Sequence, residues 1–507
     1  MGARPLTGRN RGGGWGRRPP AAFLDHLAVE RDGALPIAAQ IARRLRDLML
    51  AGGLARGARL PATRRLAAML EVSRTTVTAA VDILTAEGFL EARHGSGTYV
   101  AAQLPADRLA RASTGGTATP GPTLSRRGTL LARDSPVAST GRLFTPGLPA
   151  LDAFPLAEWR RALARALRAG GSGLLHLADP RGWPPLRHAI ADYVGPARGV
   201  ACAADQVVVL ASARQAVLLA GNLLADPGDR VWVEDPGYPD AHSALRAAGL
   251  TPVPVPVDAA GIDVAAGRRL APDARLAAVT PSHQYPLGAI MTLERRVALL
   301  DWARAAGATI LEDDYDGEFR YGGRPITALY GLDGGDRVLY VGSFSKVMFP
   351  ALRLAYLVAP PRLAEAVAQA RRAAHAEPPA LTQAALAEFV AGDAFTQHIR
   401  RMRLLYRARQ EALVAAIRRH LGGVLVVDPS DAGMHLVGQL DRAVADHAVV
   451  AAGSRVGLGM TALSRYAAGP SPGNGLVLGY AAHDAAAIEE GVRRLARIVE
   501  VVQRTRG

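Results

Sequence analysis

Lysine is almost absent from this chain. The 507 residues include 60 lysines and arginines together, and Lys346 is the one lysine among them. Arginine can replace lysine at surface charges and phosphate contacts, but not where a nucleophilic amine is needed, because its guanidinium group stays protonated. Either Lys346 survived by chance or its amine is needed, and the residues around it favour the second interpretation.

Cysteine and long apolar runs are also scarce. Cys202 is the sole cysteine, which excludes an internal disulfide and fits either a reducing cytosol or a small buried side chain. The first twenty residues are rich in Arg, Gly and Pro without a signal-peptide core, and no run is apolar enough to span a membrane. We therefore expect a soluble cytoplasmic protein with no metal site, whose residues 1–22 form a disordered basic tail.

Positive charge is abundant, and it is concentrated near the N-terminus. The net charge is +15, and residues 1–100 hold 15 arginines against 8 acidic residues, a local charge of +7. This bias suits a polyanionic partner such as nucleic acid, although many basic proteins bind none. The chain is too long for one ordinary domain. We expect a compact unit at 23–100, a flexible linker at 101–140 rich in Ala, Thr, Ser, Gly and Pro, and a large unit at 141–507.

The large unit alternates short apolar runs with helical patterns, which indicates an α/β fold. The runs are 206–211, 230–234, 276–280, 308–312, 337–342 and 354–358. Continuous apolar runs separated by helices predict a mostly parallel sheet that is buried on both faces. Ligands of such sheets bind beyond the carboxyl ends of the strands, and most of the chemically interesting residues follow one of these runs.

The N-terminal unit has the pattern of a winged helix-turn-helix. Residues 36–51 form an amphipathic helix with Ile37, Ile41, Leu45 and Leu48 on one face, Thr63 can cap a helix that ends at Leu70, and Ser73 can cap the next helix, whose stripe is Val77, Val81 and Leu84. Residues 89–100 (FLEARHGSGTYV) predict a hairpin, which would form the wing. The second helix of such a pair presents its first turn to DNA.

This N-terminal stretch resembles the winged helix of the GntR family. The segments that carry the resemblance are PIAAQIARRLRDLMLAGGL, LPATRRLA, VSRTTV and EGFLEARHGSGTYV. Relatives often carry a further arginine where Thr78 stands here. The alternative is a helical adaptor with solvated arginines. The resemblance implies that double-stranded DNA is contacted by Arg64, Arg65, Arg74, Thr75, Thr76, His94 and Gly95.

The sequence around Lys346 contains what a pyridoxal-phosphate site needs. Such a site requires an amine for the Schiff base, hydroxyls, N–H groups and a cation for the phosphate, a carboxylate for the pyridine nitrogen, and an aromatic ring face. Taken singly, Asp313 could cap a helix and Tyr238 could be a core residue. The candidates that together supply these groups are Ser212, Ala213, Arg214, Tyr238, Asp313, Tyr315, Ser343, Ser345, Lys346 and Arg353.

The region from about 175 to 480 resembles class I aminotransferases of fold type I, and the whole chain resembles the MocR family. The segments EDPGYP, TPSHQYPLG, EDDYDGEFRY and GSFSKVMFPALRLAYLV carry this resemblance. It implies a large subdomain at about 175–370, a small C-terminal α+β subdomain at about 371–507, and a homodimer. The chain departs from the class I enzymes in having Tyr285-Pro286 where they carry Asn-Pro, and it has no arginine in GNGLVLGYAA to hold a substrate carboxylate.

Two residues bear on a small-molecule effector. Arg465 stands where members that respond to GABA hold the effector carboxylate, whereas Asp240 stands where those members have a second arginine. GABA is therefore a doubtful effector. The resemblance implies a regulator that senses pyridoxal phosphate itself, or an amine or amino acid, through Lys346. The alternatives are an aminotransferase that also carries a DNA-binding domain, and a DNA-binding protein that has lost its cofactor.

Overall fold

The computed structural model describes residues 29–31, 35–93, 96–105, 123–133, 141–176, 179–322, 326–374, 377–469 and 473–504. The chain divides into two compact units, Met1–Thr123 and Leu124–Gly507. This division falls inside the range 101–140 that was predicted as a linker. At its two sides, Ala101 and Leu104 are buried in the core of the first unit, and the second unit includes helix α6 (Arg126–Arg133).

The first unit is the predicted winged helix. It consists of α2 (Ile37–Leu50), α3 (Thr63–Leu70), α4 (Arg74–Ala86) and an antiparallel hairpin of β1 (Leu90–Arg93) and β2 (Gly97–Val100). Of the two predicted apolar stripes, Ile41, Leu45, Val77 and Leu84 are buried, and Ile37, Leu48 and Val81 pack partly buried against them.

The helix caps in this unit agree with the sequence at one position and differ at another. Ser73 caps α4 as predicted, because its Oγ accepts a hydrogen bond from the N–H of Thr76 at 3.0 Å. Thr63 was predicted to cap α3, and this was wrong: Thr63 is the first residue of the helix, and Ala62 takes the cap position without a side-chain bond. Ala62 lies between Pro61 and the helix, in the extended backbone typical of a cap.

The second unit is built on an eight-stranded sheet in the order β3-β10-β9-β8-β7-β4-β5-β6. Strands β4, β5, β7, β8 and β9 are parallel, whereas β10 runs antiparallel to β3 and β9, and β6 runs antiparallel to β5. The strands are β3 (Val207–Leu210), β4 (Arg230–Asp235), β5 (Thr251–Asp258), β6 (Gly261–Ile262), β7 (Leu276–Val279), β8 (Thr309–Asp314), β9 (Val338–Ser343) and β10 (Ala355–Val358).

All six predicted runs are strands of this sheet, and β5 was missed. Its sequence, TPVPVPVD, contains a proline at every second position, at Pro252, Pro254 and Pro256. The N–H groups of alternate residues point to the same side of a strand, so the three missing donors all lie on the side away from β4. Proline is tolerated there because β6 pairs only with the end of β5, at Val257 and Asp258.

Helices cover both faces of the sheet. Helices α9 (Ala213–Leu224), α10 (Pro239–Ala247) and α15 (Pro361–Ala373) pack on one face, around Val208, Leu339 and Leu357. The opposite face packs against other helices around Val209, Trp232 and Tyr340. The remaining helices of the unit are α7 (Leu156–Gly170), α8 (Pro184–Arg198), α11 (Val264–Leu270), α12 (Leu293–Ala306), α13 (Leu329–Asp333), α14 (Phe344–Val347), α16 (Ala380–Val390), α17 (Asp393–Leu421), α18 (Asp446–Arg455) and α19 (Ala485–Arg504), with short 3-10 turns η1 to η5 between them.

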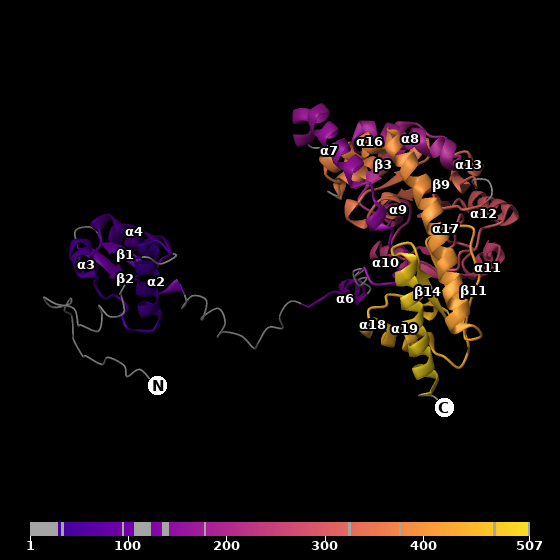
Figure 1. Cartoon of the computed structure of the whole chain (residues 1–507). Helices are drawn as coiled ribbons and strands as arrows, with labels where there is room; N and C mark the ends of the chain where they lie inside the picture. The colour runs from indigo at the N-terminus through magenta and orange to yellow at the C-terminus, as the bar shows by residue number, and fades with distance from the viewer. Residues whose placement is uncertain are drawn as a thin grey trace. The chain divides into compact units, whose positions relative to one another are not determined.

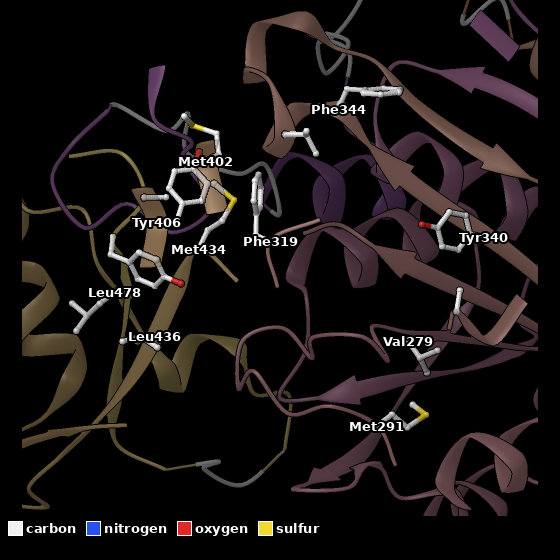
Figure 2. Packing of buried hydrophobic residues seen from close by; sticks show 14 of the residues in the cluster. Val279, Met291, Phe319, Tyr340, Phe344, Met402, Tyr406, Met434, Leu436 and Leu478 are labelled. Atoms are coloured by element: carbon white, nitrogen blue, oxygen red, sulfur yellow. The ribbon is translucent and has the colours of Figure 1, made fainter. Parts of the chain in front are cut away.

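A smaller antiparallel sheet forms the C-terminal part of the unit. Its order is β11-β12-β14-β13, from β11 (Leu425–Val427), β12 (His435–Leu440), β13 (Thr461–Ala462) and β14 (Gly475–Gly479). Helices α17 and α19 lie side by side against it (Figure 1). The loop after β8 joins this part through Phe319, which gathers with Met402, Tyr406 and Met434 (Figure 2). The rings of Phe319 and Tyr406 meet edge to face at 4.9 Å.

Across the described ranges, no helix is long and apolar enough to cross a membrane.

A bidentate ion pair anchors α8 to the end of β8. Arg198 donates from Nε and Nη2 to the two oxygens of Asp314 at 2.6 and 2.9 Å, and Tyr340 donates to the same carboxylate at 2.7 Å. The side chains of Arg198 and Asp314 are only 4% and 2% exposed. Removing only one side chain of this pair would leave the charge of the other buried and unpaired, which is strongly unfavourable.

We expect Arg198→Met to lower the free energy of unfolding of the second unit by about 3–5 kcal/mol, because Asp314 then keeps a buried charge without its partner. Urea unfolding followed by tryptophan fluorescence measures the effect. The matched control is Arg161→Met, which removes a pair with Glu158 whose side chains are 64% and 39% exposed. That pair contributes about 0.5 kcal/mol or less. Equal losses in the two variants would contradict the prediction.

Candidate functional site

The predicted site residues come together at the carboxyl ends of neighbouring strands. Tyr238 follows β4, Asp313 lies near the end of β8, and Lys346 stands on α14 directly after β9. Because these strands lie within one run of the sheet order, their ends meet at one edge. Tyr238 and Asp313 line a small common cavity, of about 20 Å³, together with His242 and Thr280.

Lys346 lies close enough to Asp313 for their charges to interact. Its Nζ donates a hydrogen bond to the carbonyl oxygen of Gly147 at 2.9 Å. Gly147 has φ +69°, which favours glycine, and a Cβ at this position would lie 2.6 Å from Nζ, so a side chain here would displace the amine. Burial lowers the pKa of Lys346, while the carboxylates of Asp316, Asp313 and Asp240 oppose that shift. A lowered pKa is what an amine needs to act as a nucleophile.

Asp313 has a buried carboxylate oxygen, Oδ1, without a hydrogen-bond partner among the described residues. Burial, followed by the neighbouring Asp314 and Asp316, raises the pKa of this carboxyl to about 7. Buried carboxylate oxygens in folded proteins nearly always have a partner, so this one indicates a donor supplied from outside the chain. The protonated pyridine nitrogen of pyridoxal phosphate is such a donor, and the residues present therefore fit this cofactor.

Tyrosine rings surround the same space. Tyr285 makes edge-to-face contacts with Tyr238 and Tyr315, both at 5.6 Å between centroids. The hydroxyl of Tyr238 donates to Asp240 at 3.0 Å, and burial raises the pKa of Tyr238 and of Tyr315, which keeps both phenols protonated. The peptide bond from Tyr285 to Pro286 is cis.

His283, to which the sequence assigned no role, fixes the position of Tyr315. Its Nδ1 lies 2.9 Å from the hydroxyl of Tyr315 and 3.0 Å from Oδ2 of Asp316. Asp316 was not among the predicted site residues either. Asp316 follows Tyr315 directly in the segment EDDYDGEF. The high density of acidic residues around the tyrosine was the sequence signal that could have identified Asp316 as a site residue.

The candidates for the phosphate lie on two helix starts and one loop. Ser212 caps α9 by accepting from the N–H of Gln215 at 3.1 Å, and Ser343 caps α14 by accepting from the N–H of Ser345 at 3.2 Å. Ala213 and Arg214 open α9, and Arg214 donates to Ser243 at 3.1 Å. Arg353 is exposed, with φ +52°, and its guanidinium group makes no hydrogen bond or ion pair within the described ranges.

Arg465 lies beside this space but points to solvent. It belongs to η5 (Leu463–Tyr466) and is exposed. The next residue, Tyr466, forms a hydroxyl pair with Tyr285 at 3.0 Å, so η5 packs at the edge of the tyrosine group. Asp240 is closer to the centre of the site, because its charge acts on Lys346, Tyr238 and Tyr285.

The candidates for DNA contact lie on α3 and at the start of α4. Arg64, Arg65, Arg74 and Thr75 are exposed, and Thr76 is half-buried. The hydroxyls of Thr75 and Thr76 lie 2.6 and 2.7 Å from Oγ of Ser73, so all three side chains are held at the cap of α4. Thr78 hydrogen-bonds the carbonyl of Arg74. His94 and Gly95, predicted at the tip of the wing, lie outside the described residues.

Comparisons with known proteins identify the family. Residues 147–495 match the model of aminotransferase class I and II, and residues 37–100 match that of bacterial regulatory proteins, gntR family. The chain is 41% identical over 472 residues to the probable rhizopine catabolism regulatory protein MocR of Rhizobium meliloti, which covers 92% of this chain and 95% of that protein. The chain belongs to the MocR family.

Two further comparisons show that this MocR-family chain is similar both to a regulator and to an enzyme. It is 34% identical to the HTH-type pyridoxine biosynthesis transcriptional regulator PdxR of Corynebacterium glutamicum, over 88% of this chain and 92% of that one. Among solved structures it resembles LysN, an alpha-aminoadipate aminotransferase of Thermus thermophilus complexed with N-(5'-phosphopyridoxyl)-L-leucine. The TM-score is 0.68 at 29% identity, covering 75% of this chain and 98% of that one. The second unit thus has the aminotransferase fold.

The unpaired carboxylate of Asp313 predicts how stability depends on pH in the cofactor-free MocR-family protein. Its pKa in the folded state, about 7, lies above the ordinary value of 3.8, so folding takes up a proton between these pH values and stability falls as the pH rises through them. We expect Asp313→Asn to stabilise the protein by about 1–2 kcal/mol at pH 8 and to have little effect near pH 4. Thermal unfolding of both proteins at the two pH values measures this.

Glu312 provides the control, because its buried carboxyl also has a pKa raised to about 7 but accepts two backbone hydrogen bonds, from Leu329 and Tyr330. Glu312→Gln should therefore destabilise the protein at both pH values. A gain from Asp313→Asn that is the same at both pH values would show that the carboxyl does not titrate in this range.

Proposed function

We propose that this chain is a transcriptional regulator that binds double-stranded DNA through its winged helix and senses pyridoxal phosphate, alone or with an amine, at Lys346. One observation carries the sensory part. The single lysine of the chain lies close enough to Asp313 for their charges to interact, and Oδ1 of Asp313 is buried without a partner among the described residues. The regulatory part is supported by the GntR unit in the same chain and by relatives that are named as regulators.

The residues have distinct tasks in the cofactor site we propose. Lys346 provides the amine for covalent attachment, Asp313 holds the pyridine nitrogen, Tyr238 covers the ring and Tyr315, positioned by His283, reaches the phenolic oxygen. Bound pyridoxal phosphate supplies an aldehyde for amines and a ring that withdraws electrons from them. We assign the phosphate to the starts of two helices and to the guanidinium group of Arg353. The residues at the helix starts are Ser212, Ala213 and Arg214 of α9 and Ser343 and Ser345 of α14.

The choice between a regulator and an enzyme depends on whether the site has a group that can hold a substrate carboxylate. The final core strand, β14, and the residues described just before it contain no arginine to fix a substrate carboxylate. Arg465 is exposed and can serve a carboxylate that approaches from solvent. Asp240 adds a negative charge close to Lys346. We propose an effector with an amine that reacts and, near Asp240, a second positive charge or hydroxyl donors.

The assembly we propose is a cytoplasmic homodimer. Two-fold symmetry suits a pair of DNA half-sites, and fold-type I sites are usually completed by a second subunit. The connection between the two units is proposed to lie between Leu104, which is buried in the first unit, and α6; residues 106–122 lie outside the described residues. A ligand changes DNA affinity in this arrangement only if it favours one of two states of the dimer, because coupling requires a difference in binding free energy.

DNA binding depends on the first turn of α4 in this proposal. We expect Arg74→Gln to weaken binding of a specific operator by about 1–3 kcal/mol if it reads a base, or to weaken all sequences and lower the salt slope by about one if it contacts a phosphate. Fluorescence anisotropy at several salt concentrations measures both. Arg161→Gln, which removes the same charge from α7, should leave DNA binding unchanged, and a loss as large as that of Arg74→Gln would remove the assignment.

The cofactor and effector are tested together by visible absorbance. We expect added pyridoxal phosphate to give the absorbance of a lysine-bound cofactor in the wild type and none in Lys346→Ala. Diamines and amino polyols should change this spectrum at lower concentrations than ω-amino acids do. Asp240→Asn should reduce that preference by about tenfold, since a charged hydrogen bond is worth about 1.5–3 kcal/mol.

Two outcomes would change the proposal. Sustained production of keto acid or aldehyde would identify an enzyme that carries a DNA-binding domain. An unchanged spectrum after pyridoxal phosphate is added to the wild type would identify a DNA-binding protein without a cofactor. Lys346→Arg is a useful companion because it keeps the charge and removes the nucleophile.

A further inference from the structure

A cleft outside the cofactor site is lined by four arginines. Arg400, Arg403 and Arg407 lie on α17, where spacings of three and four residues place them on one face of the helix. Arg320, from the loop after β8, lines the same cleft from the other side, and the cleft has a volume of about 430 Å³. This is within the size range of small-molecule sites. We call this feature the arginine cleft.

Arg320 lacks partners for its buried nitrogens. Its Nε and Nη1 are inaccessible to solvent and make no hydrogen bond with any described residue. The backbone of Arg320 is held by an antiparallel bridge to Ala432. Buried guanidinium donors are normally paired, because their desolvation is otherwise uncompensated.

The other three arginines have few counter-charges. Arg403 donates from Nε to the backbone oxygen of Glu318 at 2.5 Å, and Arg407 pairs with Glu411 at 3.2 Å, where both side chains are more than half exposed. Arg400 is exposed and has no ion pair within the described ranges. Among the described residues, Arg407 is therefore the one arginine of the four that forms an ion pair, and its partner is Glu411.

Two further acidic residues lie at the edges of the cleft. Glu318 lines an adjoining cavity together with Arg320 and Arg403, but burial raises its pKa to about 7, and it accepts a hydrogen bond from Tyr193. Asp431 lies beside Gly322 and makes no ion pair with an arginine within the described residues. Asp316 lines a separate small cavity with Arg320, and its carboxylate lies 3.0 Å from Nδ1 of His283. The described lining of the cleft itself holds four arginines and no acidic residue.

We propose that the arginine cleft is a binding site for a small phosphorylated anion. A phosphate group presents oxygens in several directions and can accept bidentate hydrogen bonds from guanidinium groups on opposite walls, whereas a planar carboxylate faces one wall. The cleft has guanidinium groups on two walls, from Arg320 on one element and from α17 on another. This favours a small ligand that enters the cleft over a DNA backbone that passes across it.

The position of the cleft connects it to the proposed cofactor site. The loop that carries Arg320 is hydrogen-bonded to the small subdomain through the backbone. The N–H of Tyr321 donates to the carbonyl oxygen of Asp431 at 2.7 Å, and the N–H of Gly433 donates to the carbonyl oxygen of Phe319 at 2.9 Å. Arg320 also lines a small cavity with His283, the residue that positions Tyr315. An anion held between this loop and α17 fixes the small subdomain against the loop that carries Tyr315.

The test is calorimetric titration of the full-length protein with pyrophosphate. We expect Arg320→Gln to weaken binding by about tenfold or more and Arg400→Gln, an exposed position that should not affect folding, to weaken it by a smaller factor. Arg418→Gln, on the same helix outside the cleft, should bind as the wild type does. Malonate should bind more weakly than pyrophosphate, and inorganic phosphate and glycerol phosphate show whether the phosphate group alone is sufficient.

The cofactor site is a second possible place for phosphate, and Arg353→Gln separates the two. Binding that persists in Arg353→Gln and is lost in Arg320→Gln supports the cleft, whether or not pyridoxal phosphate binds to Lys346. Binding that is lost only in Arg353→Gln overturns the proposal. So does a result in which Arg320→Gln and Arg400→Gln lower the salt dependence of DNA binding while no variant or wild-type protein binds pyrophosphate.

Discussion

Four buried carboxyl groups and that of the half-buried Asp313 lie within seven residues at the end of β8, and the surrounding structure is organised to accommodate them. Burial and mutual repulsion raise the pKa of several of these groups, which means that their charges are unfavourable unless each has a partner. Four have one inside the protein: Glu312 has backbone N–H groups, Asp314 has Arg198, Asp316 has His283 and Glu318 has Tyr193.

Asp313 is the exception, and the exception locates the site. Asp313 lines a cavity with Tyr238 and interacts with the charge of Lys346, and its Oδ1 has no partner among the described residues. The chain thus provides a charge there that it does not itself neutralise. This arrangement has an energetic consequence. A cofactor with a protonated ring nitrogen stabilises the folded protein by removing an unpaired charge, in addition to any contacts of its own.

The sequence was sufficient for those features that depend on local pattern or on unusual composition. Apolar runs gave six strands, Ser73 gave the cap of α4, and the scarcity of lysine singled out Lys346. It was not sufficient where a residue's role depends on a distant segment. The strand β5 was missed because its prolines suppress the usual signal, and the role of His283 depends on Tyr315 and Asp316, which approach only in the folded chain.

The prolines of β5 have an effect beyond the register of one strand. An open sheet edge exposes a row of N–H and C=O groups, which is a template for pairing with another chain. Along β5 the donors of that row are missing at Pro252, Pro254 and Pro256, and β6 covers the remaining end. A second molecule therefore finds acceptors there but no matching donors. The edge resists growth of the sheet, which protects the protein against aggregation during folding at high concentration.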